Sequence, residues 1–386
     1  MEEFYFYTEG LTVGYHGIPL IKNIKIQLKR GEILTLIGPN GAGKTTILKS
    51  IIRQLEPLGG VAVLDGRRMG EMTGKELSRK LSVVLTDRVR PELMTCRDVV
   101  ATGRYPYTGK FGILGKEDHR MVREAMELVH IEELEERDFS KTSDGQKQRV
   151  MLARAICQEP DIIVLDEPTS FLDIRYKLEF LSILQNMSRR RKLSVIMSLH
   201  ELDLAERISH QIVCVRGDKV ERFGPPEEIF TPGYIPELYE ITAGSFEPLT
   251  GSLELEPIKG PPEVFVLAGN GSGTPVYRSL QRAGIPFATG ILWENDLDYP
   301  AARALASAVI AVPPFSAAEE EVILRAQKQL DACREVVCTV EPESLGEWGN
   351  PLRRLLEHAE KQGKVVNGNT CQRSRKTGII EKTSDC

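Results

Sequence analysis

Residues 33–55 read ILTLIGPNGAGKTTILKSIIRQL and decide the fold of the first part of the chain. An apolar, β-prone run leads into a loop that matches the pattern GxxxxGK[ST] in full. Apolar residues at 47, 48, 51, 52 and 55 then give the next segment one apolar helical face. The stretch therefore predicts a strand, a phosphate-binding loop and a helix, as in a nucleotide-binding α/β domain.

The residues of this loop are candidate nucleotide ligands. Its glycines let backbone N–H groups face phosphate oxygens, and the helix N-terminus adds the positive end of its dipole. Lys44 would reach the β- and γ-phosphates, and Thr45 would hold Mg²⁺. The predicted nucleotide-binding residues of the loop are Gly38, Pro39, Asn40, Gly41, Ala42, Gly43, Lys44, Thr45 and Thr46.

Two adjacent acids follow a second apolar strand in residues 161–173, DIIVLDEPTSFLD. Side chains alternate along a strand, so Asp166 and Glu167 face different ways and can do different work. We expect Asp166 to bind the Mg²⁺ shell, and Glu167 to orient and deprotonate the attacking water. A solvated strand end would carry similar residues, but the preceding phosphate loop favours the catalytic interpretation.

The stretch TSDGQKQRVMLARAI, which starts at Thr142, lies between these two motifs. Here the chain resembles the ATPases of ATP-binding cassette (ABC) transporters, whose signature is LSGGQ. The block LDEPTSFLD resembles their Walker B motif and D-loop, VIMSLHELDLA contains a histidine like their switch histidine, and LTVGYHG contains a tyrosine where they stack a ring on adenine. The likeness covers about residues 5–250, with five motifs in the family order.

The resemblance implies functions for further residues. Tyr15 would stack on adenine, and His200 would act with Glu167 and Lys44 in catalysis. It also implies a head-to-tail homodimer with ATP and Mg²⁺ between the subunits, which suits two-fold symmetry. The signature residues Ser143, Gly145 and Gln146 would close on the partner's ATP, and Asp173 would link the two sites. Ser143 and Gln146 also form the S-x-x-Q pattern of a helix capping box.

Two departures from the family pattern stand out. Thr142 replaces the first leucine of the signature, and Asp144 replaces its first glycine; the acid suits a helix start but should point away from a phosphate. The family also has a glutamine after the strand that leads into its helical subdomain. Thr86 and Asp87 stand there in this chain, and either could replace it, with Thr86 preferred.

The branch of the family is indicated by residues 94–129 and by the stretch GRYPYTG within them. They resemble importers of ferric siderophores, haem and cobalamin. We therefore expect an ATPase on the cytoplasmic face of the cell membrane that works with integral membrane permease subunits and, indirectly, with an extracytoplasmic substrate-binding protein. The alternatives are a soluble, non-transport ABC ATPase and an ATP sensor; a single cassette without heptads disfavours the first, and Glu167 disfavours the second.

Composition is consistent with this expectation. The net charge of −5 gives no case for nucleic-acid binding, and the seven cysteines form no CxxC pair, as suits a reducing cytoplasm. The N-terminus lacks the pattern of a signal peptide. No apolar stretch approaches the ~20 residues that span a bilayer, so a partner chain would have to supply any membrane part.

The cassette likeness stops near residue 255, where LEPIKGPP reads as a linker. Strand-like and helix-like segments then alternate, which predicts a small parallel α/β domain. The expected strands cover 264–268, 287–292, 308–312 and 335–340, and the expected helices cover 275–283, 300–307, 316–332 and 350–362. The predicted fold is thus an ABC-type P-loop NTPase (1–255, helical subdomain about 88–158), a Rossmann-like and possibly regulatory domain (256–366) and a disordered tail (367–386).

A second glycine-rich turn, AGNGSGTPVYRSLQRAG, occupies residues 268–284. It lacks the last glycine of the dinucleotide fingerprint, since Thr274 stands there, although Glu294 and Asp296 follow roughly where a ribose-binding acid would. Three interpretations stay open. The turn could be a packing feature with Thr274 as cap and Pro275 as first helical residue, a small-ligand site, or an NAD site.

Overall fold

The computed structural model describes residues 4–85, 93–109, 112–247, 251–341, 346–347 and 349–367. Contacts within the chain divide it into two compact units, residues 1–240 and 241–386. The predicted domain boundary at residues 255 and 256 lies inside the second unit. None of the helices within the described ranges is both long and apolar enough to cross a bilayer.

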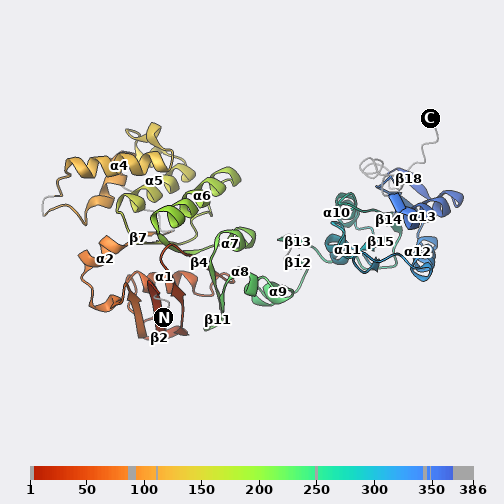
Figure 1. Ribbon diagram of the computed structural model, residues 1–386, viewed down its shortest axis with the longest axis horizontal. Coiled ribbons are helices and arrows are strands. Elements are labelled where there is room, and N and C mark those ends of the chain that lie inside the picture. The colour runs from red at the N-terminus through yellow and green to blue at the C-terminus, as the bar shows by residue number, and fades with distance from the viewer. Residues whose placement is uncertain are drawn as a thin grey trace. The chain divides into compact units, whose positions relative to one another are not determined.

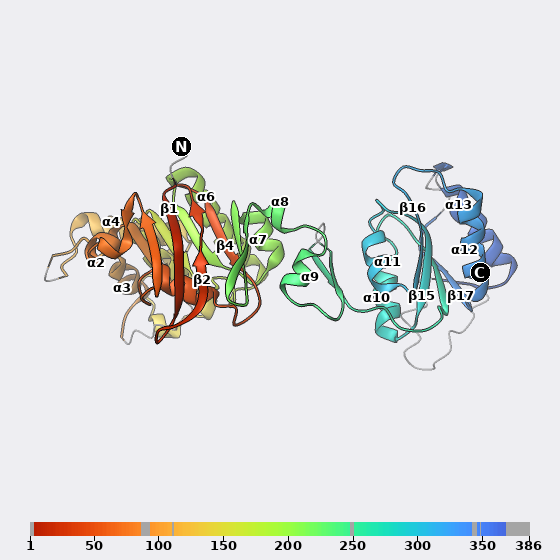
Figure 2. The same cartoon turned by 90° about the horizontal axis from the view of Figure 1, so that it is seen from below.

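The first unit contains an 11-stranded mixed sheet (Figures 1 and 2). Its strands lie in the order β6 (Arg67–Arg68), β5 (Gly59–Leu64), β1 (Phe6–Tyr15), β2 (Ile18–Ile24), β11 (Lys219–Gly224), β10 (Gln211–Arg216), β4 (Ile33–Ile37), β9 (Ser194–Ser198), β8 (Ile162–Leu165) and β7 (Leu81–Val84), with β3 (Gln27–Leu28) paired to β1. The run from β10 through β4, β9 and β8 to β7 is parallel. Because parallel strands end at one edge, the loops after β4, β8 and β9 meet there.

Helices pack on this sheet and on one another. The unit contains α1 (Lys44–Ile51), α2 (Gly74–Lys80), α3 (Cys96–Ala101), α4 (Lys116–Leu128), α5 (Asp144–Cys157), α6 (Ile174–Arg191), α7 (Leu202–Ile208), α8 (Pro226–Ile229) and α9 (Tyr234–Leu238). Short 3-10 turns cover Met69–Glu71, Thr102–Arg104, Glu132–Leu134 and Phe139–Lys141. Helices α3, α4 and α5 contact one another and form the helical part seen beside the sheet in Figure 1.

The strand–loop–helix expected from residues 33–55 is present. Strand β4 is buried along its whole length, as the apolar run requires. Helix α1 buries Ile47, Leu48 and Ile51, but it ends at Ile51. The prediction that the apolar helical face continues to Leu55 is therefore wrong, since the chain turns after Ile52, where the backbone N–H still bonds the Leu48 carbonyl.

The second unit contains a five-stranded parallel sheet in the order β16 (Ala308–Val312), β15 (Phe287–Trp293), β14 (Val264–Leu267), β17 (Glu335–Cys338) and β18 (Val365–Asn367). Figure 2 shows α10 (Thr274–Ala283) and α11 (Tyr299–Leu305) on one face, and α12 (Glu320–Ala332) and α13 (Asn350–Lys361) on the other. Separate apolar clusters lie under the two helix layers. A hairpin of β12 (Ser245–Glu247) and β13 (Ser252–Glu254) precedes them.

This order, 3-2-1-4-5 in strand sequence, is the Rossmann order 3-2-1-4-5-6 without its sixth strand, and the predicted fold class is confirmed. The sequence did not reveal β18. Asn367, taken from sequence as the start of the tail, is the last residue of β18, because Cys338 pairs with it. Residues 368–386, the rest of the predicted tail, lie outside the described residues.

The second glycine turn differs from the packing interpretation in its cap. Thr274, not Pro275, is the first residue of α10, and Thr274 is not the cap. Instead Asp298 accepts hydrogen bonds from the backbone N–H groups of Gly273 (2.9 Å) and Thr274 (2.7 Å). Gly273 is required by close packing, because a Cβ there would lie 2.5 Å from the Ala268 Cβ.

Candidate ATPase site

The phosphate-binding loop (P-loop, residues 38–45) leaves β4 and enters α1. Gly38, Gly41 and Gly43 have φ of 144°, 80° and 96°, values that favour glycine. Gly38 also has no room for a side chain, because a Cβ would lie 2.2 Å from the Val215 carbonyl oxygen. Gly38 and Gly43, which the sequence pattern marks, and also Gly41 are thus needed for the loop's backbone path.

Lys44 lies buried over this loop. Its Nζ donates hydrogen bonds to the carbonyl oxygens of Gly38 (2.8 Å) and Pro39 (3.1 Å). Burial lowers the pKa of the Lys44 amine, while the carboxylates of Glu167 and Asp166 act in the opposite direction. The ammonium group is therefore held at the loop by two carbonyl oxygens and by electrostatic attraction to the carboxylates of Asp166 and Glu167, which follow β8.

The predicted metal ligands are brought together across 121 positions of sequence. Thr45 Oγ1 lies 3.2 Å from Asp166 Oδ1, to which it donates a hydrogen bond. Hydroxyl and carboxylate oxygens are the donors that Mg²⁺ prefers, and this ion usually takes only one or two protein ligands besides water and phosphate. Within the described residues no group of three or more His, Cys, Asp or Glu could hold a metal. The two oxygens of Thr45 and Asp166 thus fit an Mg²⁺ ion whose other ligands are water and phosphate.

Two of the three predicted catalytic residues, Glu167 and His200, meet beside this pair. Glu167 follows β8 with φ of 47°, a left-handed value that is uncommon outside glycine. Its Oε1 lies 2.6 Å from Nε2 of His200, which follows the neighbouring strand β9. Ser170 Oγ donates to the other carboxylate oxygen, at 3.3 Å. The Glu167 carboxylate is thus held by two side chains and stays partly open to solvent.

Ser198 is a member of this site that sequence reasoning missed. It is fully buried, its Oγ donates to Asp166 Oδ1 at 2.7 Å, and it accepts from the Glu167 backbone N–H at 2.9 Å. One hydroxyl therefore fixes both acids. Its position two residues before His200 was the only available signal.

Tyr239 is a second missed residue. Its hydroxyl accepts a hydrogen bond from the Gly38 N–H at 3.0 Å, across 201 positions of sequence. Burial raises the pKa of Tyr239 to about 12. No local pattern links Tyr239 to the P-loop.

Tyr15, predicted to stack on adenine, lies near the start of α1. Its hydroxyl is 3.2 Å from Thr46 Oγ1, and its side chain is 45 % exposed.

The signature residues lie at the start of α5. Ser143 accepts from the Gln146 N–H and donates its own N–H to the Gln146 side chain, so the predicted capping box is confirmed. Gly145 lies beside Leu172, since a Cβ on Gly145 would be 3.5 Å from that side chain. The signature is therefore close to the start of α6 in the same chain. There Asp173 caps α6 by accepting from the Tyr176 N–H. The hydrogen bonds of Ser143 thus stay within α5 and do not join it to its own P-loop.

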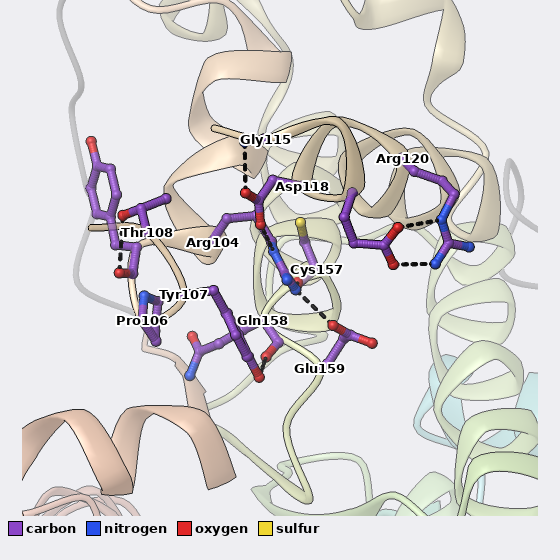
Figure 3. Close-up of polar contacts among 12 residues, drawn as sticks. Arg104, Pro106, Tyr107, Thr108, Gly115, Asp118, Arg120, Cys157, Gln158 and Glu159 are labelled. Carbon is purple, nitrogen blue, oxygen red and sulfur yellow. Dashed lines mark hydrogen bonds and ion pairs between the residues drawn. The ribbon is translucent and has the colours of Figure 1, made fainter. Parts of the chain in front are cut away.

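The stretch GRYPYTG is tied down by a buried arginine (Figure 3). Arg104 bonds Asp118 of α4, the Cys157 carbonyl oxygen and Glu159, each at 2.8 Å. Its guanidinium lies 4.0 Å from the centre of the Tyr107 ring. These bonds join the stretch both to α4 and to the end of α5.

A second link connects this cluster with the sheet. The Tyr107 hydroxyl donates to the Gln158 carbonyl oxygen at 3.0 Å (Figure 3). The Gln158 amide donates to the Leu81 carbonyl oxygen at 2.7 Å. Leu81 begins β7, which leads toward Thr86 and Asp87. Those two residues, the candidates for the family glutamine, lie outside the described residues.

Comparison with known proteins agrees with this geometry. A family model described as "ABC transporter" matches residues 21–170, and a second, the MJ0874 family, matches residues 287–380. The uncharacterized ABC transporter ATP-binding protein MJ0873 of Methanocaldococcus jannaschii is 41 % identical over 275 residues, which cover 71 % of this chain and 94 % of the relative.

Two further comparisons extend the result. The cobalamin import ATP-binding protein BtuD of Halobacterium salinarum is 30 % identical over 335 residues, 85 % of this chain and 84 % of the relative, so the likeness reaches into the second unit. A solved dimeric structure of MJ0796, described as a bacterial ABC transporter cassette, matches 57 % of this chain and 98 % of its own with a TM-score of 0.52 and 25 % identity. The motifs, the fold and these relatives together establish that the chain belongs to the ABC transporter family and is an ABC ATPase.

Proposed function

We propose that the chain is the ATP-hydrolysing subunit of an importer that carries a metal chelate through separate membrane subunits. The observation that carries the ATPase step is the 2.6 Å contact between Glu167 and His200 beside the Thr45–Asp166 pair. The cargo class, a ferric siderophore, haem or cobalamin, is supported by the GRYPYTG stretch and by the likeness to a cobalamin import protein.

The P-loop holds the triphosphate in this proposal. Backbone N–H groups and Lys44 bind its oxygens, and the Tyr15 ring stacks on adenine. Thr45 and Asp166 hold Mg²⁺, which when bound withdraws charge from the β- and γ-phosphates. Lys44 exchanges its present carbonyl acceptors for phosphate oxygens.

Glu167 then acts on the attacking water. Its carboxylate takes a proton from water while the water oxygen bonds to the γ-phosphorus and the bond to the ADP oxygen breaks. His200 fixes the carboxylate through Oε1. Ser198 keeps Asp166 and Glu167 in register, so that metal ligand and base stay aligned.

The proposed active form is a head-to-tail homodimer. Ser143, Gly145 and Gln146 cap the partner's ATP, because the first turn of α5 offers backbone N–H groups and the positive end of the helix dipole. Asp173 links the two sites from the start of α6. The dimeric cassette among the similar solved structures supports this arrangement.

Coupling to the permease runs through the helical part. Tyr105, 62 % exposed, stands on the segment that Arg104 and Tyr107 anchor, and β7 joins that anchor to the sheet. We place the chain at the cytoplasmic face of the membrane, with permease subunits as direct partners, an extracytoplasmic substrate-binding protein as an indirect one, and no nucleic acid.

Replacing the base tests the ATPase step. Glu167→Gln should lower steady-state ATP hydrolysis at least 100-fold while the affinity for a fluorescent ATP analogue stays within threefold of wild type. Gel filtration with ATP should then detect a dimer. Glu127→Gln, an exposed carboxylate on α4, is the matched control and should hydrolyse ATP normally. Normal hydrolysis by Glu167→Gln would contradict the assignment.

A separate capture experiment tests the importer. The tagged full chain is purified from mildly solubilised membranes of its source cells, and a polytopic membrane protein should accompany it. The captured complex, placed in liposomes, should hydrolyse ATP faster with one of the three chelates and its binding protein. Soluble partners alone would favour the other candidate, a non-transport ABC ATPase.

A further inference from the structure

A pocket of about 400 Å³ opens in the second unit at the carboxyl ends of β14 and β15. Gly269 and Asn270 follow β14, Asn295 to Leu297 follow β15, and Leu352 enters from the start of α13. β14 pairs with β15 on one side and with β17 on the other, and the pocket lies on the β15 side of this point, where the strand order reverses. Ligands of open α/β sheets bind outside the carboxyl ends of the strands, which is the edge where this pocket opens.

The positions for a phosphate in this turn are already taken by carboxylates. Asp298, fully buried, accepts from the N–H groups of Gly273 and Thr274 at the start of α10. Asp296 accepts from the Asn270 N–H through both oxygens, at 3.1 and 3.0 Å. The donors that would bind a pyrophosphate are therefore occupied, and two acids would repel it.

The rest of the lining is apolar and aromatic. The Trp293 ring is fixed, since its Nε1 donates to the Ser316 carbonyl oxygen at 2.7 Å. Leu297 and Phe315 line the same pocket and are 71 % and 83 % exposed. No lysine, arginine or histidine is among the described residues that line it. Asn270 and Asn295 add amide groups beside the Asp296 carboxylate.

We propose that this pocket binds a small, planar ring compound that is neutral or cationic and carries no phosphate. Trp293 and Phe315 supply surfaces for the ring, and the asparagines and Asp296 supply hydrogen-bond partners. The volume lies within the range of ~300–1,000 Å³ that is usual for small-molecule sites. Of the two acids that stand where a dinucleotide site would have its ribose-binding acid, Asp296 lines the pocket and Glu294 is exposed. In this proposal Asp296 binds the ring compound and not a ribose.

Trp293 provides a local reporter of binding. The chain contains two tryptophans, so Trp348→Phe in the full chain leaves Trp293 as the only tryptophan, whose emission can be excited apart from that of tyrosine. The probes are two matched pairs, adenosine with AMP and thiamine with thiamine monophosphate, which differ only by the phosphate. At least one phosphate-free member should quench Trp293 saturably and bind at least 10-fold more tightly than its phosphorylated partner.

Variants then locate the site. Leu297→Ala and Phe315→Ala should each weaken that binding at least fivefold. Leu324→Ala removes a similarly exposed side chain from α12 that does not line the pocket, and it should leave the affinity unchanged. The proposal is overturned if no probe quenches Trp293, if a phosphorylated probe binds as tightly as its partner, or if Leu324→Ala weakens binding as much as the pocket variants.

Discussion

Removing the Ser198 hydroxyl tests how the two acids of the ATPase site are held. Ser198→Ala deletes the bond to Asp166 (2.7 Å) and leaves the Glu167 N–H without its acceptor. A hydrogen bond to a charged group contributes about 1.5–3 kcal/mol. If that energy aligns the acids in the transition state, then kcat should fall about 10- to 150-fold, since each 1.36 kcal/mol is tenfold in rate.

A matched serine separates alignment from folding. Ser194 lies on the same strand and is also fully buried, but it accepts from the Gly31 N–H at the other end of β9. Both alanine variants should lose a similar free energy of unfolding, about 1–3 kcal/mol in urea titrations. Only Ser198→Ala should lose kcat in a steady-state phosphate-release assay. Equal kcat for the two variants would refute the reasoning.

Two further predictions concern Tyr239 and Asp298. Tyr239→Phe removes the acceptor of the Gly38 N–H and should cost about 1–3 kcal/mol of stability. Folding raises the Tyr239 pKa from 10.0 to about 12, so the unfolded chain loses this proton first as the pH rises. The wild type should therefore lose stability between pH 10 and 12, by up to about 1.4 kcal/mol per pH unit and more steeply than the variant. Urea midpoints that change in parallel with pH in the two proteins would contradict this. Asp298→Ala leaves the N–H groups of Gly273 and Thr274 unpaired and should destabilise the second unit by about 2–5 kcal/mol, whereas Asp298→Asn keeps one acceptor and should cost less. Unfolding of the full chain with Trp348→Phe, followed by Trp293 fluorescence, measures the loss for the two Asp298 variants. Equal loss for Asn and Ala would mean that the stability contributed by the carboxylate does not come from capping the helix.

Local patterns predicted much of this protein. The P-loop, the paired acids after β8 and the capping box at Ser143 each depend on neighbours within a few residues, and each is where the sequence indicated. The parallel α/β character of the second unit also followed from alternating segments. The functions of all the predicted site residues stay predictions, and Thr86 and Asp87 lie outside the described residues.

What the sequence by itself determined is the local pattern that short-range spacing encodes: a glycine-rich loop between β4 and α1, and two adjacent acids directly after β8. What only the tertiary structure decided is which distant groups complete them. Ser198 forms hydrogen bonds with Asp166 and with the Glu167 backbone, and Tyr239 accepts a hydrogen bond from the Gly38 N–H, 201 positions away. Asp298 caps the start of α10, where one interpretation of the sequence had Thr274 as the cap. Such partners depend on the order and packing of the strands. A buried donor forms its hydrogen bond with whichever acceptor the fold brings near, so no local pattern specifies that acceptor.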